Sequence, residues 1–374
     1  NRRLVDNINN FKNSFKKFNP LICFSVKSNY NSTILKIIKN HGLGADVVSD
    51  GELKKVLSLG FKPNKIVYSG VGKKINELQY AISKNILLIN VESESELKNI
   101  EAIAKKSRKK INIGLRLNPN IDAKTNSKIS TGRTQDKFGL NGGDIIQILK
   151  KFQNSKNINI KCLSVHIGSQ ITQNKPYNNV LIVINKILSK SKYKFDYIDL
   201  GGGMGIKYNQ KNKSLNYSKL SDSIYKFSKK NGCKIIFEPG RSIVGNTAVL
   251  LTKVIYIKNS STKKFIIIDA GMNDLIRPAL YNSLHDIIPL TKKFSKNFKS
   301  HDFVGPICET SDRFLKTKNY QKIKEGDNLA IKDVGAYGIV LSSNYNLRPR
   351  PIEIIVKNSK IKKISKKQNI NDII

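Results

Sequence analysis

The chain has 374 residues, enough for one large domain and a smaller one. It carries 67 Lys and Arg against 27 Asp and Glu, a formal net charge of +40. The basic residues spread over nearly every expected loop and helix, and Asn and Ile are also abundant. A compositional bias therefore explains the charge better than a specific nucleic-acid site, although weak polyanion binding at low salt is expected. The sequence shows no signal peptide and no apolar run of membrane-spanning length.

Four cysteines, at positions 23, 162, 233 and 308, lack the spacing of metal ligands. Three of them lie in or beside apolar strand-like runs, where reduced, buried cysteine is the usual arrangement. We therefore expect no metal site and a reduced, cytoplasmic setting. The chain opens at Asn1 without a methionine, so we expect its natural N-terminus to lie upstream.

Eight short apolar runs follow one another along the first 240 or so residues, most of them separated by helix-like segments. They cover 22–26, 44–48, 65–69, 86–91, 111–117, 162–167, 197–200 and 234–237. Strands that alternate with helices indicate a parallel sheet, and eight such units match a closed (β/α)8 barrel of about 250 residues. A doubly wound open sheet is the alternative.

The pattern changes after about residue 245. Strand-like stretches joined by turns follow, namely AVLLTKVIYIK, KFIIIDAG, DNLAIKDVGAYG and PIEIIVK. The lysine-rich end, KNSKIKKISKKQNINDII, is expected to be a mostly solvated tail. The predicted fold is thus α/β, with a (β/α)8 TIM barrel over residues 1–245 and a C-terminal antiparallel β domain over 246–374.

Polar residues and glycines follow the predicted barrel strands, which is where barrel enzymes carry their chemistry. Lys27 ends the first run, and the seventh and eighth runs lead into DLGGGMG and FEPGRS. A lysine at a strand end is often one whose ammonium simply reaches solvent. Lys27 alone therefore leaves two interpretations open, a surface lysine and a catalytic amine at the barrel mouth.

Three further features favour the catalytic interpretation. The glycine-rich loop 200–205 puts backbone amides where a phosphate can approach, although a tight turn explains it equally well. Glu238 ends the eighth run, where a carboxylate can pair with a protonated ring nitrogen. His166 is either a core histidine or one that stacks on a planar ring. Together with Lys27, these groups indicate pyridoxal phosphate, whose aldehyde reacts with a lysine amine.

Ten ordered motifs carry a resemblance to a known family. They are SVKSN, GADVVSDGEL, NVESESEL, ISTGRTQDKFGL, VHIGSQI, DLGGGMGI, FEPGRSIVG, DAGMNDLIRPALY, GPICETSD and GAYGIVLSSNYNLRPRP. Through them the chain resembles the fold-type III pyridoxal-phosphate decarboxylases from about residue 20 to residue 357, and the diaminopimelate decarboxylases most closely. TNSK, before ISTG, departs from the family's His-Pro-aromatic run, which puts the packing of that loop in doubt. The family's leading strand is also missing.

The resemblance implies a role for each matching residue. Lys27 would carry the cofactor covalently, His166 would stack on its ring and Glu238 would contact the ring nitrogen. Further cofactor contacts would come from Asp46, Ser169, Gly201, Gly202, Gly203, Pro239, Gly240, Arg241 and Tyr337. Cys308 would donate a proton, and the substrate would be bound by Arg241, Arg277, Tyr281, Glu309 and Tyr337. In this family the site is shared across a homodimer, with Cys308 and Glu309 reaching the partner subunit's lysine.

The charges of Arg241, Arg277 and Glu309 indicate which groups the expected substrate carries. A guanidinium clamps a carboxylate, and Glu309 suits an ammonium. meso-2,6-Diaminopimelate carries both groups at its far end, so the predicted reaction is its decarboxylation to L-lysine and CO2, the last step of lysine biosynthesis. Ornithine has only the amine there.

This reaction has three alternatives, and the residues argue against the second and the third. Carboxynorspermidine, which also bears a carboxylate, is a minor alternative substrate. An alanine-racemase-like activity would call for a cation in place of Glu238. A non-catalytic homologue would have lost Lys27, Cys308 or the arginines, all of which are present.

Overall fold

The computed structural model describes residues 2–208, 214–291, 296–297, 300–318 and 320–374. It divides into two compact units. One consists of Asp6–Gly205 and Lys213–Ser242, and the other consists of Asn1–Val5, Ile206–Asn212 and Ile243–Ile374. We call them the barrel unit and the β unit and describe each by itself.

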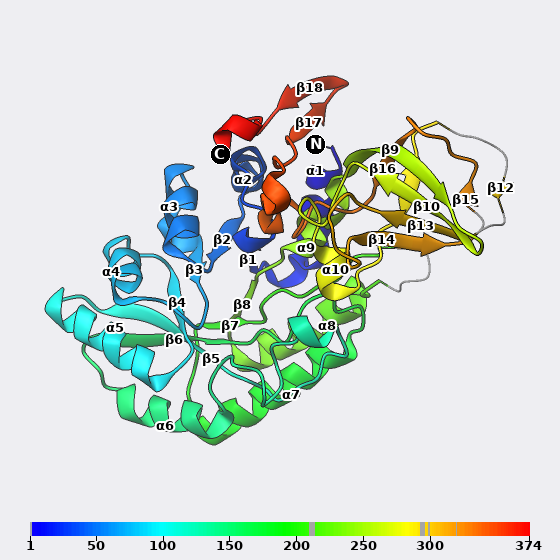
Figure 1. Ribbon diagram of the computed structural model, residues 1–374. Helices are drawn as coiled ribbons and strands as arrows, with labels where there is room; N and C mark the ends of the chain where they lie inside the picture. Colours follow the sequence, from blue (N-terminus) through cyan, green and yellow to red (C-terminus); the bar gives the residue numbers. More distant parts are fainter. Residues whose placement is uncertain (1, 209–213, 292–295, 298–299, 319) are drawn as a thin grey trace. The chain divides into compact units, whose positions relative to one another are not determined.

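Eight parallel strands close the barrel (Figure 1). They are β1 (Leu21–Ser25), β2 (Gly44–Val47), β3 (Ile66–Tyr68), β4 (Leu88–Val91), β5 (Ile111–Arg116), β6 (Ile158–Ser164), β7 (Tyr197–Asp199) and β8 (Lys234–Phe237). Leu21 of β1 pairs with Ile236 of β8, which completes the ring. Each strand coincides with one of the eight apolar runs to within a few residues, so the predicted barrel is confirmed and the open sheet is excluded.

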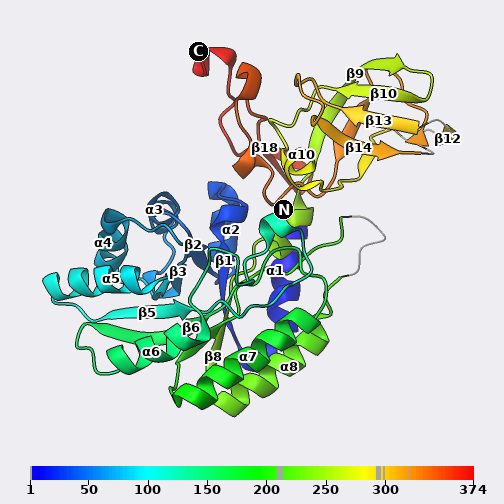
Figure 2. The ribbon, with the colours of Figure 1, turned by 60° about the horizontal axis from the view of Figure 1, so that its bottom comes forward.

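Helices alternate with these strands and cover the outside of the barrel (Figure 1). They are α1 (Arg2–Ser14), α2 (Ser32–Asn40), α3 (Asp50–Ser58), α4 (Ile75–Ser83), α5 (Glu94–Lys106), α6 (Gly142–Phe152), α7 (Lys175–Ser191) and α8 (Tyr217–Asn231). The short α9 (Arg241–Val244) follows the loop after β8. Figure 2 shows α7 and α8 side by side on the barrel surface. This arrangement buries the apolar face of each helix against the strands.

The sequence specifies the helix starts locally. The hydroxyls of Ser49 and Ser93 cap α3 and α5 by accepting hydrogen bonds from the backbone N–H of Glu52 and Glu96, respectively. Such caps satisfy N–H groups that have no partner within the helix.

The barrel interior is filled by side chains from several strands, among them Cys23, Val67, Leu88, Cys162 and Ile236. The barrel is therefore a packed core whose chemistry lies at its ends.

The β unit contains a six-stranded sheet in the order β11-β16-β9-β10-β13-β14. The strands and the helix between them are β9 (Leu250–Asn259), β10 (Lys263–Ile268), α10 (Arg277–Tyr281), β11 (Ile287–Pro289), β13 (Ser300–Val304), β14 (Arg313–Thr317) and β16 (Asn328–Ile331). β12 (Lys296–Asn297) pairs with β15 (Tyr320–Gln321), and β17 (Ile354–Lys357) pairs with β18 (Lys360–Lys363). Buried Ile266, Phe303 and Leu329 belong to the core of this unit.

The predicted α/β fold class, a TIM barrel followed by a β domain, is confirmed, with two differences of detail. The sheet is mostly antiparallel, but β10 and β13 pair in parallel. The lysine-rich end is exposed, as predicted, yet it contributes β18 to a hairpin.

Cys23, Cys162 and Cys233 are buried and unbridged, as the sequence indicates, whereas Cys308 is exposed. None of the described helices is long and apolar enough to cross a membrane.

Candidate active site

Each barrel strand leads into a polar residue or a glycine at its C-terminal end. In strand order these are Lys27, Asp46, Ser69, Asn90, Arg116, His166, Gly201 and Glu238. All the strands run in parallel around a closed barrel, so their C-terminal ends meet at one rim. The sequence prediction of a polar barrel mouth is therefore confirmed at the level of the fold.

Lys27 lies in a short 3-10 helix (Val26–Ser28) directly after β1. Its Nζ is 3.3 Å from Oδ2 of Asp46, which is fully buried, while the lysine side chain remains 35% exposed. The register of β1 and β2 sets Ser25 opposite Asp46, and the serine hydroxyl donates to the same carboxylate oxygen at 2.6 Å. The lysine amine is thus held by a buried anion and still accessible at the mouth.

A buried pair of acidic residues, Asp199 and Glu238, lies at the ends of β7 and β8. Asp199 accepts hydrogen bonds from the amide of Gly201 at 2.9 Å, from Nδ2 of Asn90 at 3.2 Å and from the hydroxyl of Ser164 at 3.1 Å. Burial raises the pKa of Glu238 well above its usual value, and the nearby negative charge of Asp199 raises it further. Because three donors stabilise ionised Asp199, the proton of this pair resides on Glu238.

The loop Gly201–Gly203 is shaped by close backbone packing. A Cβ on Gly202 would lie 2.1 Å from the carbonyl oxygen of Glu238, and one on Gly203 would lie 2.3 Å from that of Gly168. The amide of Gly201 donates to Asp199. Two glycines of the predicted phosphate loop therefore bring the backbone close to its neighbours, where a side chain has no room.

His166 follows β6 and is half-buried. Its Nδ1 accepts a hydrogen bond from the amide of Gly202 at 3.1 Å, so the ring carries its proton on Nε2. Enclosure by the protein lowers the pKa of His166 well below its usual value, and the positive charges of Lys27 and Arg116 lower it further. The ring is neutral and fixed in orientation, which suits stacking and does not suit a cationic role.

The loop containing TNSK packs against this histidine segment. Asn126 caps the short 3-10 helix Ser127–Ile129, and the hydroxyl of Thr131 donates to the carbonyl of His166 at 2.7 Å. Ser130 forms an isolated β-bridge with Gly168. The departure from the family sequence at this loop leaves it ordered against the rim.

Arg241 begins α9, directly after the Glu238-Pro239-Gly240 segment, and is buried. Its Nη2 donates to the hydroxyl of Ser169 at 3.0 Å. A Cβ on Gly240 would lie 2.9 Å from the side chain of Ser28, beside Lys27. The barrel end thus brings three more of the predicted cofactor residues into packed positions.

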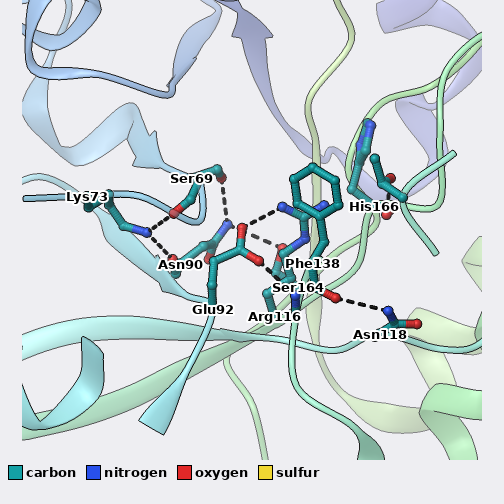
Figure 3. A network of polar contacts seen from close by, with 12 residues as sticks. Ser69, Lys73, Asn90, Glu92, Arg116, Asn118, Phe138, Ser164 and His166 are labelled. Carbon is teal, nitrogen blue, oxygen red and sulfur yellow. Dashed lines mark hydrogen bonds and ion pairs between the residues drawn. The ribbon is translucent and has the colours of Figure 1, made fainter. Parts of the chain in front are cut away.

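Figure 3 shows a network that the sequence analysis did not single out. The buried Arg116 forms an ion pair with Glu92 at 2.5 Å, and its guanidinium lies 4.7 Å from the centre of the Phe138 ring. Asn90 donates to the hydroxyls of Ser69 and Ser164, each at 3.2 Å. Asn90 and Glu92 belong to the NVESESEL motif, and the signal for a role beyond the family resemblance is a polar residue within or directly after the apolar run 86–91.

In the β unit, Arg277 and Tyr281 lie at the two ends of α10. Arg277 is only 4% exposed, and its guanidinium carbon lies 4.7 Å from the centre of the Tyr208 ring. Nη2 of Arg277 donates to the hydroxyl of Ser283 at 3.2 Å. The predicted substrate arginine is therefore held by its own unit in a fixed orientation.

Cys308 and Glu309 lie on an exposed loop between β13 and β14. Asp312 shapes this loop by accepting hydrogen bonds from the amides of Ile307 and Met272, each at 2.7 Å. The hydroxyls of Tyr345 and Ser311 donate to Glu309 and hold the pKa of its carboxyl below its usual value. Glu309 is thus an exposed carboxylate, which suits recognition of an ammonium.

Tyr337 has a left-handed backbone conformation, with φ of +56°. For a residue with a bulky side chain this conformation costs about 1 kcal/mol or more, and such strain clusters at functional sites. A Cβ on Gly335 would lie 1.9 Å from the carbonyl oxygen of Val244, so this turn is packed tightly against backbone. The tyrosine side chain is half-buried.

The structure thus gathers one group of the predicted residues at the barrel mouth and another within the β unit. The first group consists of Lys27, Asp46, His166, Ser169, Gly201, Gly202, Gly203, Glu238, Pro239, Gly240 and Arg241. The second consists of Arg277, Tyr281, Cys308, Glu309 and Tyr337. The roles assigned to these residues stay predictions.

The barrel mouth fits pyridoxal phosphate. Glu238 is buried beside the acidic Asp199 and Asp46, and a protonated ring nitrogen would supply positive charge there. Lys27 is the accessible amine that an aldehyde requires. The glycine loop allows close approach of backbone without side chains.

Comparisons with known proteins agree with this chemistry. The family described as "Pyridoxal-dependent decarboxylase, pyridoxal binding domain" matches residues 1–245. The diaminopimelate decarboxylase of Aquifex aeolicus is 41% identical over 360 residues, which cover 95% of this chain and 85% of that protein. The enzyme of the same name from Helicobacter pylori strain J99 is 40% identical over 367 residues, covering 97% and 90%.

Solved structures give the same result. The crystal structure of the Helicobacter pylori diaminopimelate decarboxylase complexed with L-lysine matches with a TM-score of 0.93 and 38% identity, covering 100% of this chain and 93% of that one. The arginine decarboxylase of Paramecium bursaria Chlorella virus, at 20% identity and a TM-score of 0.79, covering 92% of each chain, shares the fold.

The chain therefore belongs to the pyridoxal-dependent decarboxylases, which are carboxy-lyases that use pyridoxal phosphate. Within that family it belongs to the diaminopimelate decarboxylases. The predicted family, enzyme class and cofactor are confirmed.

Proposed function

We propose that this carboxy-lyase acts through Lys27 at the mouth of the barrel and that its substrate is meso-2,6-diaminopimelate. One carboxyl group leaves as CO2 and L-lysine remains, in the last step of lysine biosynthesis. The observation that carries the proposal is the placement of an accessible amine, Lys27, and a buried acid, Glu238, at the same end of one closed barrel. The likeness to diaminopimelate decarboxylases along nearly the whole chain supports the choice of substrate.

The barrel residues would hold and orient the cofactor. Lys27 would bind its aldehyde covalently, and Asp46, 3.3 Å from the lysine Nζ, would keep the lysine directed at the mouth. The neutral ring of His166 would stack on the cofactor ring, and the buried Glu238 would face the ring nitrogen and keep it protonated. When bound, pyridoxal phosphate supplies a ring that withdraws electrons from the bond to the departing carboxyl group.

The loops that follow β7 and β8 would hold the phosphate of the cofactor. Gly201, Gly202 and Gly203 allow the backbone to approach it, and Pro239, Gly240 and Arg241 continue the same rim. Ser169 and Arg241 are already joined by a hydrogen bond, so one hydroxyl and one guanidinium are placed together for an anion. Arg241 also contacts the substrate.

The β unit supplies the groups that recognise the substrate. Arg277 would clamp the carboxylate that the product retains, and Glu309 would bind the neighbouring ammonium. Tyr281 and Tyr337 would contact the substrate, and Tyr337 would also touch the cofactor. Cys308 returns a proton to the carbon that loses CO2. The exposure of Cys308 and the ionised state of Glu309 support these roles.

Two chains form a homodimer with shared active sites, in which Cys308 and Glu309 of one subunit serve the lysine of the other. The barrel domain comprises residues 1–245, and residues 246–374 form the β domain that contributes to the shared site. The enzyme works in the cytoplasm. The family resemblance supports the dimer, and the reduced cysteines together with the biosynthetic reaction support the location.

A substrate panel tests the proposed function. The purified protein is loaded with pyridoxal phosphate and incubated separately with meso-diaminopimelate, ornithine, arginine and carboxynorspermidine, and the CO2 released is measured. We expect CO2 and equimolar L-lysine from meso-diaminopimelate and little CO2 from the others, because ornithine and arginine lack a second carboxylate. Preferred release from ornithine or carboxynorspermidine would reject the proposed substrate.

A further inference from the structure

We propose that His285 is a positioning residue that holds the guanidinium of Arg277 for the carboxylate of the substrate. The proposal rests on the role of Arg277 given above. It adds a specificity determinant that does not itself touch the substrate.

Two short hydrogen bonds fix the imidazole of His285. Its Nε2 lies 2.7 Å from Nη1 of Arg277, and its Nδ1 lies 2.7 Å from the carbonyl oxygen of Lys332. His285 is 1% exposed and Arg277 is 4% exposed. Both contacts are therefore shielded from water, where a misplaced donor or acceptor is costly.

The partners determine which nitrogen carries the proton. A carbonyl oxygen only accepts, so Nδ1 of His285 donates to Lys332. A guanidinium only donates, so Nε2 of His285 accepts from Arg277. His285 is thus a neutral imidazole in one tautomer, with its lone pair directed at Arg277. The carbonyl of Lys332 orients the imidazole ring, and the ring in turn orients the guanidinium of Arg277.

An aromatic ring completes the arrangement. The guanidinium of Arg277 stacks 4.7 Å from the centre of the Tyr208 ring, and the imidazole of His285 meets the same ring at an interplanar angle of 73°. Ser283 accepts from Nη2 of Arg277 at 3.2 Å. One nitrogen of the guanidinium is therefore fixed by His285, another by Ser283, and its plane by Tyr208.

This geometry bears on specificity because a carboxylate is recognised through the direction of the guanidinium N–H groups as well as through its charge. A guanidinium that turns freely keeps its charge but loses that direction. His285 therefore contributes to the binding of ligands that carry the retained carboxylate and contributes little to ligands that lack it.

Two variants separate this role from a structural one. In His285→Asn, the side-chain NH2 takes the place of Nδ1–H and can still donate to the carbonyl of Lys332, but no atom takes the place of the acceptor Nε2. His285→Gln reaches further and offers an acceptor to Arg277. The probes are meso-diaminopimelate as substrate, L-lysine as a competing ligand with the carboxylate, and 1,5-diaminopentane as a competing ligand without it.

We expect His285→Asn to raise KM for meso-diaminopimelate and to weaken inhibition by L-lysine about 10- to 100-fold, the range for one hydrogen bond to a charged group. kcat should change much less, inhibition by 1,5-diaminopentane should stay within about twofold, and His285→Gln should recover most of the loss in both KM and L-lysine inhibition.

Equal weakening of both inhibitors, or an unchanged response to L-lysine, would overturn the role of His285. Absence of meso-diaminopimelate decarboxylation by the wild-type chain would instead reject the proposed substrate, and that result is seen before any variant is compared.

Discussion

Gly202 offers a sharp test of how the barrel mouth is built, through the substitution Gly202→Ala. The added Cβ would lie 2.1 Å from the carbonyl oxygen of Glu238 and 3.0 Å from its carbonyl carbon. Both atoms belong to the backbone that continues β8, so no flexible side chain can move aside. The loop Gly201–Gly203 or the end of β8 must shift instead.

The free-energy cost of Gly202→Ala can be derived from the contact between the added Cβ and the backbone of Glu238. Overpacking a close-packed interior costs typically about 1–3 kcal/mol, and a clash with backbone lies toward the upper end of that range. If the loop moves away to relieve the clash, cofactor binding must restore its position. A cost of about 3 kcal/mol then corresponds to a loss in affinity of about 100-fold.

The assay has two parts, urea unfolding of the apoprotein and titration with pyridoxal phosphate followed by absorbance. Gly72→Ala is the matched control, because a Cβ there meets nothing within 4 Å and the residue is exposed. We expect the control to behave like the wild type or to gain up to about 1 kcal/mol in the free energy of unfolding. A Gly202→Ala protein with wild-type stability and wild-type cofactor affinity would refute the proposed packing of this loop.

Three further predictions follow from the same geometry. Glu238→Gln should retain pyridoxal phosphate while kcat falls about 100-fold or more, because one group that stabilises developing charge is lost; near-normal turnover would remove Glu238 from its role. Burial raises the pKa of Glu52 from 4.5 to about 7. The folded state therefore holds this proton more tightly than the unfolded state, and the free energy of unfolding falls as the pH rises from about 4.5 to about 7. Glu52→Gln, which does not titrate, should gain stability relative to the wild type across that interval in urea unfolding, and a difference that is independent of pH would contradict the burial argument. Inactive Lys27→Ala and inactive Cys308→Ala chains, mixed under conditions that exchange subunits, should regain part of the CO2 release, because a mixed dimer rebuilds one shared site; no recovery after verified exchange would show that each chain builds its site alone.

The barrel was predictable because its strands are short and mostly apolar and because most of them are separated by helix-like segments. The run 44–48 appears as a strand almost residue for residue, and all four residues of β2 are buried, as expected of a parallel strand covered on both faces. The β unit was less predictable. The antiparallel pattern was clear in β9 and β16, but the parallel pairing of β10 with β13 depends on a crossover that leaves no local signal.

Some residues of the candidate site were also predictable from the sequence, and others were not. Lys27, Glu238 and the glycine loop were visible because each interrupts or ends an apolar run. Asn90 and Asp199 were missed as functional residues because their partners lie on other strands, and only the closed barrel brings those hydroxyls and amides together. His285 was missed for the same reason, since Arg277 and Lys332 meet it only in the folded unit.

The covalent attachment of the cofactor at Lys27 is the central claim, and reduction with borohydride tests it most directly. The protein is loaded with pyridoxal phosphate, reduced, digested and mapped by mass spectrometry. We predict one pyridoxyl-labelled peptide, carrying the label on Lys27 beside Ser28, and loss of that label in Lys27→Ala. A stoichiometric label on a different lysine, with Lys27 unmodified, would contradict the account.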